Sequence, residues 1–113
     1  MKIKTLKKRK DFVLSNKFGE KYFKKNFILQ KFSPQDRTNF ELMFGFTATK
    51  KIGNAVKRNR AKRRMRSLIS TFLKENDKLF DDTSTYILIA KKSLIKASFL
   101  DLKAEMKECL NKS

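Results

Sequence analysis

An apolar residue recurs at every second position over residues 40–49. Smaller or more polar residues occupy one side of this segment, and the other side carries Phe40, Leu42, Phe44, Phe46 and Ala48. A period of two predicts a β-strand with one buried face. Aromatic and β-branched residues upstream predict a short strand and then a longer one over residues 25–32, and the polar residues after it predict a turn.

The hydrophobic period changes after Asn54, which predicts a long amphipathic helix. Apolar residues recur there at steps of four, three, one and three positions, at Ala61, Met65, Leu68, Ile69 and Phe72. This spacing places them in one stripe along a helix. Asn54 is a residue type that caps helix starts, so the helix is expected to run from Asn54 to about Glu75.

The remaining elements complete a single domain. The apolar run over residues 85–90 predicts a central strand, and Ser98 and Asp101 have the spacing of a capping box at the start of a last helix. The apolar face of that helix carries Phe99, Leu102, Met106, Cys109 and Leu110. With a further helix predicted at residues 8–16, the order is α-β-β-β-α-β-α. The expected fold is an α/β (α+β) sandwich in which helices cover a four-stranded sheet, with residues 1–113 as one domain.

Charge narrows the kinds of partner that this domain can bind. The chain has a formal net charge of +18, and residues 1–70 hold 21 basic but only 4 acidic residues. Such asymmetry favours a polyanion that binds the first two-thirds of the chain. The single cysteine excludes an internal disulfide and fits a reducing cytosol, so a cytoplasmic location is expected. No apolar run is long enough to span a membrane, and the basic start lacks the apolar segment of a secretory signal.

The positive charge is densest at the start of the long helix. Nine of the eighteen residues in KKIGNAVKRNRAKRRMRS, residues 50–67, are Lys or Arg, and none is acidic. Six like-charge pairs at i+3 or i+4 cost about 1–3 kcal/mol in the free protein. A solvated face would mix signs, and arginine binds phosphate in a bidentate way, so nucleic acid is the favoured polyanion. The alternative is a helix whose cations are only solvated and that resembles a localisation signal. Charge alone does not show whether the nucleic acid is DNA or RNA.

The same segment resembles the signature of the bacterial ribonuclease P protein subunit. The matching positions are Lys51, Gly53, Ala55, Val56, Arg58, Asn59, Arg60, Lys62, Arg63 and Arg66. The segment LKKRKDF, with a glycine seven residues after it, and YILIAKK before the last helix fit the family in the same order. The resemblance implies the fold described above, with a left-handed β-α-β crossover through the basic helix, although such crossovers are usually right-handed.

The resemblance also implies a division of labour between protein and RNA. A large catalytic RNA would hold the Mg²⁺ ions and cleave precursor tRNA, and the protein would bind both that RNA and the 5′ leader. The chain would thus be part of an enzyme only as a subunit of the holoenzyme, with no obligate protein partner. The residues agree, because the chain has no histidine and no recognisable triad, carboxylate pair or metal cluster. No protein-bound cofactor is expected.

Two sets of site residues follow from the resemblance. The helix motif is expected to contact the catalytic RNA through Lys51, Arg58, Asn59, Arg60, Lys62, Arg63 and Arg66. A cleft between sheet and helix is expected to hold the single-stranded leader, lined by Phe12, Thr47 and Thr49. Each of these residues also has an alternative role without RNA contact. In that case Asn59 is an uncharged residue that limits repulsion between cations, the threonines lie on a solvent-exposed strand face, and Phe12 belongs to the core.

The sequence departs from the family at two cleft positions. Asn16 and Gln30 stand where relatives commonly carry aromatic residues, so hydrogen bonding is expected there in place of stacking on leader bases.

Two other functions compete with the function of this family. A ribosomal or RNA-chaperone protein of similar fold would bind bulk RNA, and a protein-only nuclease would cleave precursor tRNA without added RNA.

Overall fold

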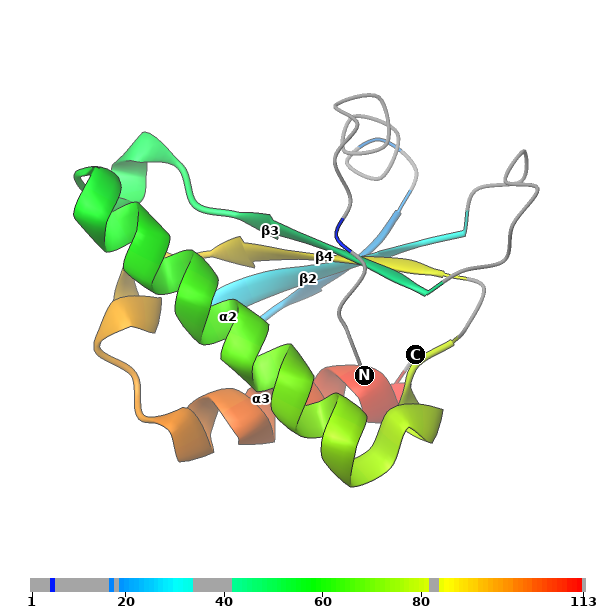
Figure 1. Ribbon diagram of the computed structural model, residues 1–113. Coiled ribbons are helices and arrows are strands. Elements are labelled where there is room, and N and C mark those ends of the chain that lie inside the picture. Colours follow the sequence, from blue (N-terminus) through cyan, green and yellow to red (C-terminus); the bar gives the residue numbers. More distant parts are fainter. Residues whose placement is uncertain (1–4, 6–16, 18, 34–41, 82–83, 113) are drawn as a thin grey trace.

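A four-stranded sheet forms one layer of the molecule, and α2 and α3 lie together on one of its faces (Figure 1). The structure is a computed structural model that describes residues 5, 17, 19–33, 42–81 and 84–112 of the chain. The strands and helices are β1 (Glu20–Phe23), β2 (Phe27–Phe32), β3 (Met43–Thr47), α2 (Ala55–Asn76), β4 (Thr85–Ala90) and α3 (Phe99–Lys112). Short 3₁₀ helices follow three of them, namely η1 (Lys50–Ile52), η2 (Asp77–Leu79) and η3 (Lys92–Ile95).

The strand order in the sheet is β1-β2-β4-β3. β2 pairs antiparallel with both β1 and β4, whereas β3 and β4 are parallel neighbours joined in the chain through α2. β4 therefore lies inside the sheet, as its continuous apolar run predicted. The α+β class, the four-stranded sheet and the β-α-β unit through the basic helix are confirmed. The helix predicted at residues 8–16 lies outside the described residues.

One face of the sheet forms the core together with the two helices. Leu29 pairs with Leu88, which pairs in turn with Phe46, so these three side chains share that face. The predicted stripe of α2 packs onto it, and Ala61, Met65, Leu68 and Ile69 are fully buried. The predicted apolar face of α3 is also buried, although its first member, Phe99, is only partly covered.

Both helices begin where the sequence predicted. The side-chain oxygen Oδ1 of Asn54 accepts a hydrogen bond from the backbone N–H of Lys57, at 3.0 Å. At α3, the Ser98 hydroxyl accepts one from the backbone N–H of Asp101, at 3.1 Å. Each cap satisfies a backbone donor that the first turn of a helix leaves without a partner.

Two strands are shorter than the sequence predicted. The prediction that β3 continues to Thr49 is wrong, because Thr49 accepts a hydrogen bond from Ile52 N–H and the chain turns into η1 to bury the Ile52 side chain. β2 begins at Phe27 rather than at residue 25, since the bond from Lys24 N–H to the Phe27 carbonyl closes the turn before it. Gly45 is buried as well, so the middle of β3 is covered on both faces.

Candidate nucleic-acid interface

The turn that leads into α2 depends on a glycine. Gly53 has φ 138°, a backbone conformation that residues with a Cβ rarely adopt. A Cβ at this position would lie 2.7 Å from Cδ of Lys57, whose side chain covers the glycine. Gly53 therefore allows the chain to pass directly from the buried Ile52 into the cationic first turn of α2.

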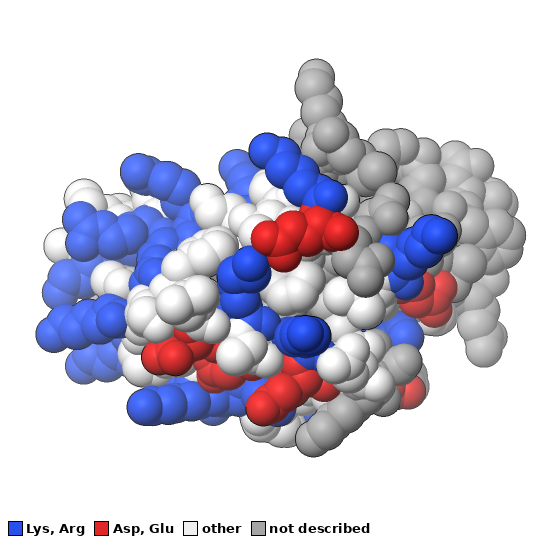
Figure 2. Space-filling view, turned by 90° about the horizontal axis from the view of Figure 1, so that it is seen from below, with Lys and Arg blue, Asp and Glu red and all other residues white. Residues whose placement is uncertain are grey.

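The side of α2 that faces away from the sheet is cationic and open to solvent. Exposed positions over its first three turns include Lys57, Asn59, Arg60, Lys62, Arg63 and Arg66. No acidic residue occurs in the first turn, and Glu75 is the first along α2. Figure 2 shows Lys and Arg gathered over the end of the molecule where α2 begins, with acidic groups farther along. Of the sequence-predicted RNA contacts on the helix, all but the half-buried Arg58 are thus exposed.

Two of the predicted residues lie along the side of α2 that faces β3. The Arg66 guanidinium carbon lies 5.7 Å from the ring centroid of Phe46, a cation–π contact on the edge strand of the sheet. Arg58 is half-buried, and its Nη1 donates to the Gly53 carbonyl at 3.4 Å. With Lys62 they occur at i, i+4 and i+8, so they form a row between the helix and the strand.

The second face of the sheet, opposite the face that α2 and α3 cover, has an open part (Figure 1). Thr47, Ile89 and Ile28 pair across the sheet and are half-buried. Phe23 on β1 pairs with Ile28 and is 68% exposed, so an aromatic ring ends this row of side chains. Thr47 therefore lies on the sheet face opposite the one that carries Phe44 and Phe46, as the alternation over residues 40–49 predicted, whereas Phe12 lies outside the described residues.

Two of the other cleft expectations change with the structure. Thr49 is exposed, but it lies before η1 and does not continue the strand face of Thr47. Lys51, one of the predicted RNA contacts, is exposed in η1. Gln30 is 3% exposed, so its amide is not available on the surface for hydrogen bonding to a leader base. Asn16 lies outside the described residues.

Some charges elsewhere among the described residues are paired. Ion pairs join Lys24 to Glu108 at 2.6 Å, Lys103 to Glu75 at 3.0 Å, and Lys31 to Asp81 at 3.8 Å. The hydrogen bond to Glu108 raises the pKa of Lys24 above its usual value. Similarly, the Tyr22 hydroxyl donates a hydrogen bond to the Glu20 carboxylate at 2.7 Å, which raises the pKa of Tyr22 to about 12. Within the described residues, no such pair involves a cation of the first three turns of α2.

The chemistry of the site is that of a binding surface. Within residues 19–33, 42–81 and 84–112 no three His, Cys, Asp or Glu side chains are grouped so that they could hold a metal ion. The helices of these segments include none that is long and apolar enough to cross a membrane. The site consists of exposed guanidinium and ammonium groups on α2 and, on the opposite face of the sheet, an open row of side chains that ends in the exposed ring of Phe23 on β1.

The sequence was compared with known families and proteins, and the model of the family Ribonuclease P matches residues 1–113. The chain belongs to the ribonuclease P protein family. The Bacillus pumilus ribonuclease P protein component is 34% identical over 108 residues, which cover 96% of this chain and 86% of that protein. The component from Nitratiruptor sp. is 33% identical over 110 residues, covering 97% and 92%. Family membership implies a component of ribonuclease P, an enzyme of tRNA processing.

Solved ribonuclease P proteins have the same fold. The Staphylococcus aureus protein aligns with a TM-score of 0.74 at 24% identity, over 97% of this chain and 94% of that one. The Thermotoga maritima protein aligns with a TM-score of 0.74 at 20% identity, over 97% of each chain. These likenesses support the sheet order and helix placement described above.

Arg64 and Phe23 are two residues that the sequence did not single out. The Nη1 atom of Arg64 donates to the carbonyls of Leu94 and Ile95, at 2.6 and 2.8 Å. A helical wheel places Arg64 on the flank of the cationic face but contains no information about η3. For Phe23, the only signal in the sequence was an aromatic residue between lysines in a short strand.

Proposed function

We propose that the chain is the protein subunit of ribonuclease P that binds the catalytic RNA and the 5′ leader of precursor tRNA, and so promotes removal of the leader. The observation that carries this proposal is the cationic face of α2, which has no ion pair with the described residues, in a member of the ribonuclease P protein family. Nucleic acid relieves the like-charge repulsion on that face, because each phosphate neutralises a cation and releases counterions. Cleavage is assigned to the RNA, with Mg²⁺ held mainly by the RNA.

The RNA contacts are assigned to the exposed side of α2. Arg60, Arg63 and Arg66 present guanidinium groups that bind phosphate oxygens in a bidentate way. Asn59, in the midst of these cations, offers an amide for a hydrogen bond close to a phosphate or a hydrated metal ion. Lys51 in η1 adds an ammonium group just before the helix.

The leader is assigned to the open row on the second face of the sheet. Thr47 gives this row a hydroxyl, and Phe23 gives it an aromatic ring that is 68% exposed. Single-stranded nucleic acid binds such surfaces by stacking bases on aromatic rings near cations, and each stacked base contributes about 1–3 kcal/mol. Because Gln30 is buried, Phe23 is the side chain that replaces the aromatic residue of relatives in this assignment.

The proposal is tested by cleavage of precursor tRNA at low Mg²⁺ by a bacterial ribonuclease P RNA, with and without this protein. We expect the protein to restore cleavage at the mature 5′ end and to cleave nothing by itself. Unchanged cleavage despite tight RNA binding would contradict the proposal and favour a ribosomal or chaperone role. Cleavage by the protein alone would instead indicate a protein-only nuclease.

The leader assignment has its own test in the Phe23→Ala variant. We expect this variant to weaken binding of precursor tRNA by about 1–3 kcal/mol when the substrate carries a leader of several nucleotides. Binding of mature tRNA should not change, and Phe23→Tyr, which retains the ring, should behave as the unaltered protein. Equal losses for substrates with and without a leader would refute a stacking role.

A further inference from the structure

η3 is fixed rigidly beside the first half of α2, although about 30 residues separate them in the chain. The carbonyls of Leu94 and Ile95 both accept hydrogen bonds from Arg64, and the side chain of Leu94 is fully buried. On its other side, the Ser93 hydroxyl donates to the Lys25 carbonyl at 3.1 Å, and Lys91 N–H donates to the Asn26 carbonyl at 3.0 Å. The segment is thus held from two directions and by its own core residue.

This anchoring leaves two lysines on the outside of the segment. Lys92, in η3, and Lys96, directly after it, are both exposed. Arg60 precedes Arg64 by one helical turn, so it lies on the same side of α2 as η3, and Lys57 lies close to that side as well. Lys57, Arg60, Lys92 and Lys96 are here called the α2–η3 strip. Figure 1 shows η3 next to the first turns of α2, and Figure 2 shows Lys and Arg gathered at this end.

The strip has the same unbalanced charge as the exposed face of α2. Among the described residues, no acidic side chain forms an ion pair with any of its four members. The first acidic residue of α3, Asp101, comes five residues after Lys96, beyond the start of that helix. Four cations from two segments without a counter-charge repel one another unless an anion lies across them.

We propose that the α2–η3 strip is a second phosphate-binding surface, which extends the RNA interface around the side of α2, and that Arg64 positions it. This inference rests on the proposed function, since the ligand is the phosphate backbone of the same RNA. Arg64 is half-buried, and its Nη1 is engaged by two carbonyls, so it acts through η3 rather than on phosphate. Its guanidinium donates to carbonyls at the end of η3, where a helix leaves backbone bonding incomplete, and the Leu94 carbonyl accepts a further bond from Ala97 N–H at 3.4 Å.

The strip is tested by the salt dependence of binding to a transcribed ribonuclease P RNA. We expect Lys92→Ala/Lys96→Ala to weaken binding by about 10- to 30-fold at 0.15 M salt and to lower the salt slope by about 1.4–1.8, the value for two lost phosphate contacts. The matched control is Lys78→Ala/Lys107→Ala, which removes two exposed lysines of η2 and α3. Because it has the same net charge, any loss shared by both variants is a general effect of charge.

Arg64→Met tests the positioning role, since it keeps an apolar stem but removes the guanidinium. We expect amide exchange at Leu94–Ala97 to become at least tenfold faster while exchange in the middle of α3 is unchanged. Combined with Lys92→Ala/Lys96→Ala, Arg64→Met should lower the salt slope no further. An additional decrease would show that Arg64 contacts phosphate itself and would overturn its positioning role.

The outcomes separate this inference from the proposed function. In one outcome, the unaltered protein binds RNA, Arg63→Gln weakens binding, and the Lys92/Lys96 variant binds as its control does. The proposal of the α2–η3 strip is then overturned, and the proposed function stands. If the unaltered protein does not bind the RNA, both are overturned. A larger loss for the Lys92/Lys96 variant than for its control supports the strip.

Discussion

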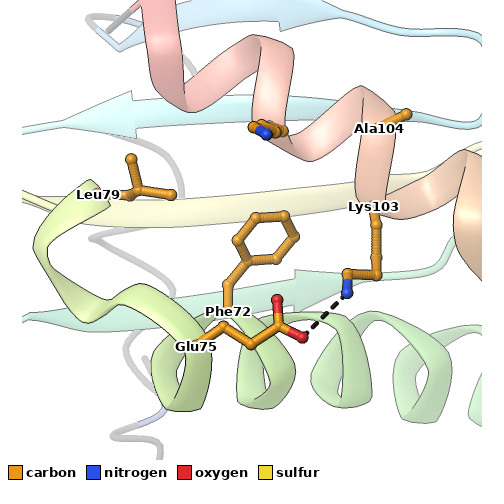
Figure 3. A pocket seen from close by; sticks show the side chains of 6 residues that line it. Phe72, Glu75, Leu79, Lys103 and Ala104 are labelled. Carbon is orange, nitrogen blue, oxygen red and sulfur yellow. Dashed lines mark hydrogen bonds and ion pairs between the residues drawn. The ribbon is translucent and has the colours of Figure 1, made fainter.

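The two halves of α2 use charge in opposite ways. Over its first three turns the helix exposes a row of cations with no acidic neighbour, and the described residues provide them with no ion pair. At its other end Glu75 pairs with Lys103 of α3 at 3.0 Å, and both residues line a pocket of about 300 Å³ (Figure 3). In the second half a carboxylate thus pairs with a neighbouring cation, whereas the described residues provide no such partner for the cations of the first half.

The contrast shows why total charge alone is a weak guide to function. Lys103 and Lys24 carry the same positive charge as Arg63, but each has a carboxylate partner on the protein. Surface pairs of this kind contribute about 0.2–1 kcal/mol to stability. The cations of the first half instead repel one another, so they lower stability in the free protein and become favourable when phosphate binds.

The largest expected effect comes from neutralising the exposed arginines. The variant Arg60→Gln/Arg63→Gln/Arg66→Gln should bind a ribonuclease P RNA about 50- to 200-fold more weakly at 0.15 M salt, as expected for three lost phosphate contacts. Glutamine keeps a long polar side chain with similar helix propensity. The control, Lys74→Gln/Lys78→Gln/Lys107→Gln, neutralises three exposed lysines from the end of α2, η2 and α3. Equal losses for the two variants, measured by filter binding, would remove the distinction between the halves.

A substitution of the helix cap is expected to have a smaller effect, which raises the stability of the protein and lowers its affinity for RNA. Asp caps a helix as well as Asn, and its negative charge is favourable at the N-terminal end of the helix. Asn54→Asp should therefore raise the free energy of unfolding of the free protein by about 0.3–1 kcal/mol. It should also weaken RNA binding several-fold, because it places an anion beside the phosphates. Urea denaturation and RNA titration of the same preparation measure both changes, and an increase in affinity would contradict our interpretation of this helix start.

The smallest effect is expected in the second half. Lys103→Met removes the pair with Glu75 and should change the free energy of unfolding by at most about 1 kcal/mol. Its affinity for RNA should fall no more than that of Lys107→Met, a matched loss of one exposed charge on the same helix. A specific loss of RNA binding for Lys103→Met, relative to that control, would extend the interface to this end of α2.

Much of the fold follows from local patterns in the sequence. The apolar stripe of α2, its Asn54 cap, the Ser98 cap of α3 and the central β4 are all found as predicted, since each is encoded by neighbouring residues. The end of β3 was not predictable in this way, because burial of Ile52 against the core decides where the chain turns. Gln30 illustrates the same limit, since a side chain on the second face is exposed or buried according to what lies above it.

The candidate site, like the fold, was predictable only where it depends on neighbouring residues. Exposure of the motif residues on α2 was predictable from a helical wheel, since it depends on one helix only. The roles of Arg64 and Phe23 were not, because each depends on a contact or an open face formed by segments far apart in sequence. Arg64 would have counted as one more exposed cation without the carbonyls of η3 beside it.

The most direct test of the central claim uses one variant, Arg63→Gln, and two measurements. Arg63 takes part in two like-charge pairs, with Arg60 and Arg66, so the variant should raise the free energy of unfolding of the free protein by about 0.4–1 kcal/mol. The same variant should lower the salt slope of RNA binding by about 0.7–0.9, which corresponds to one phosphate contact. A more stable protein that binds RNA less well is the result our account predicts. A variant with lower stability and an unchanged salt slope would contradict it.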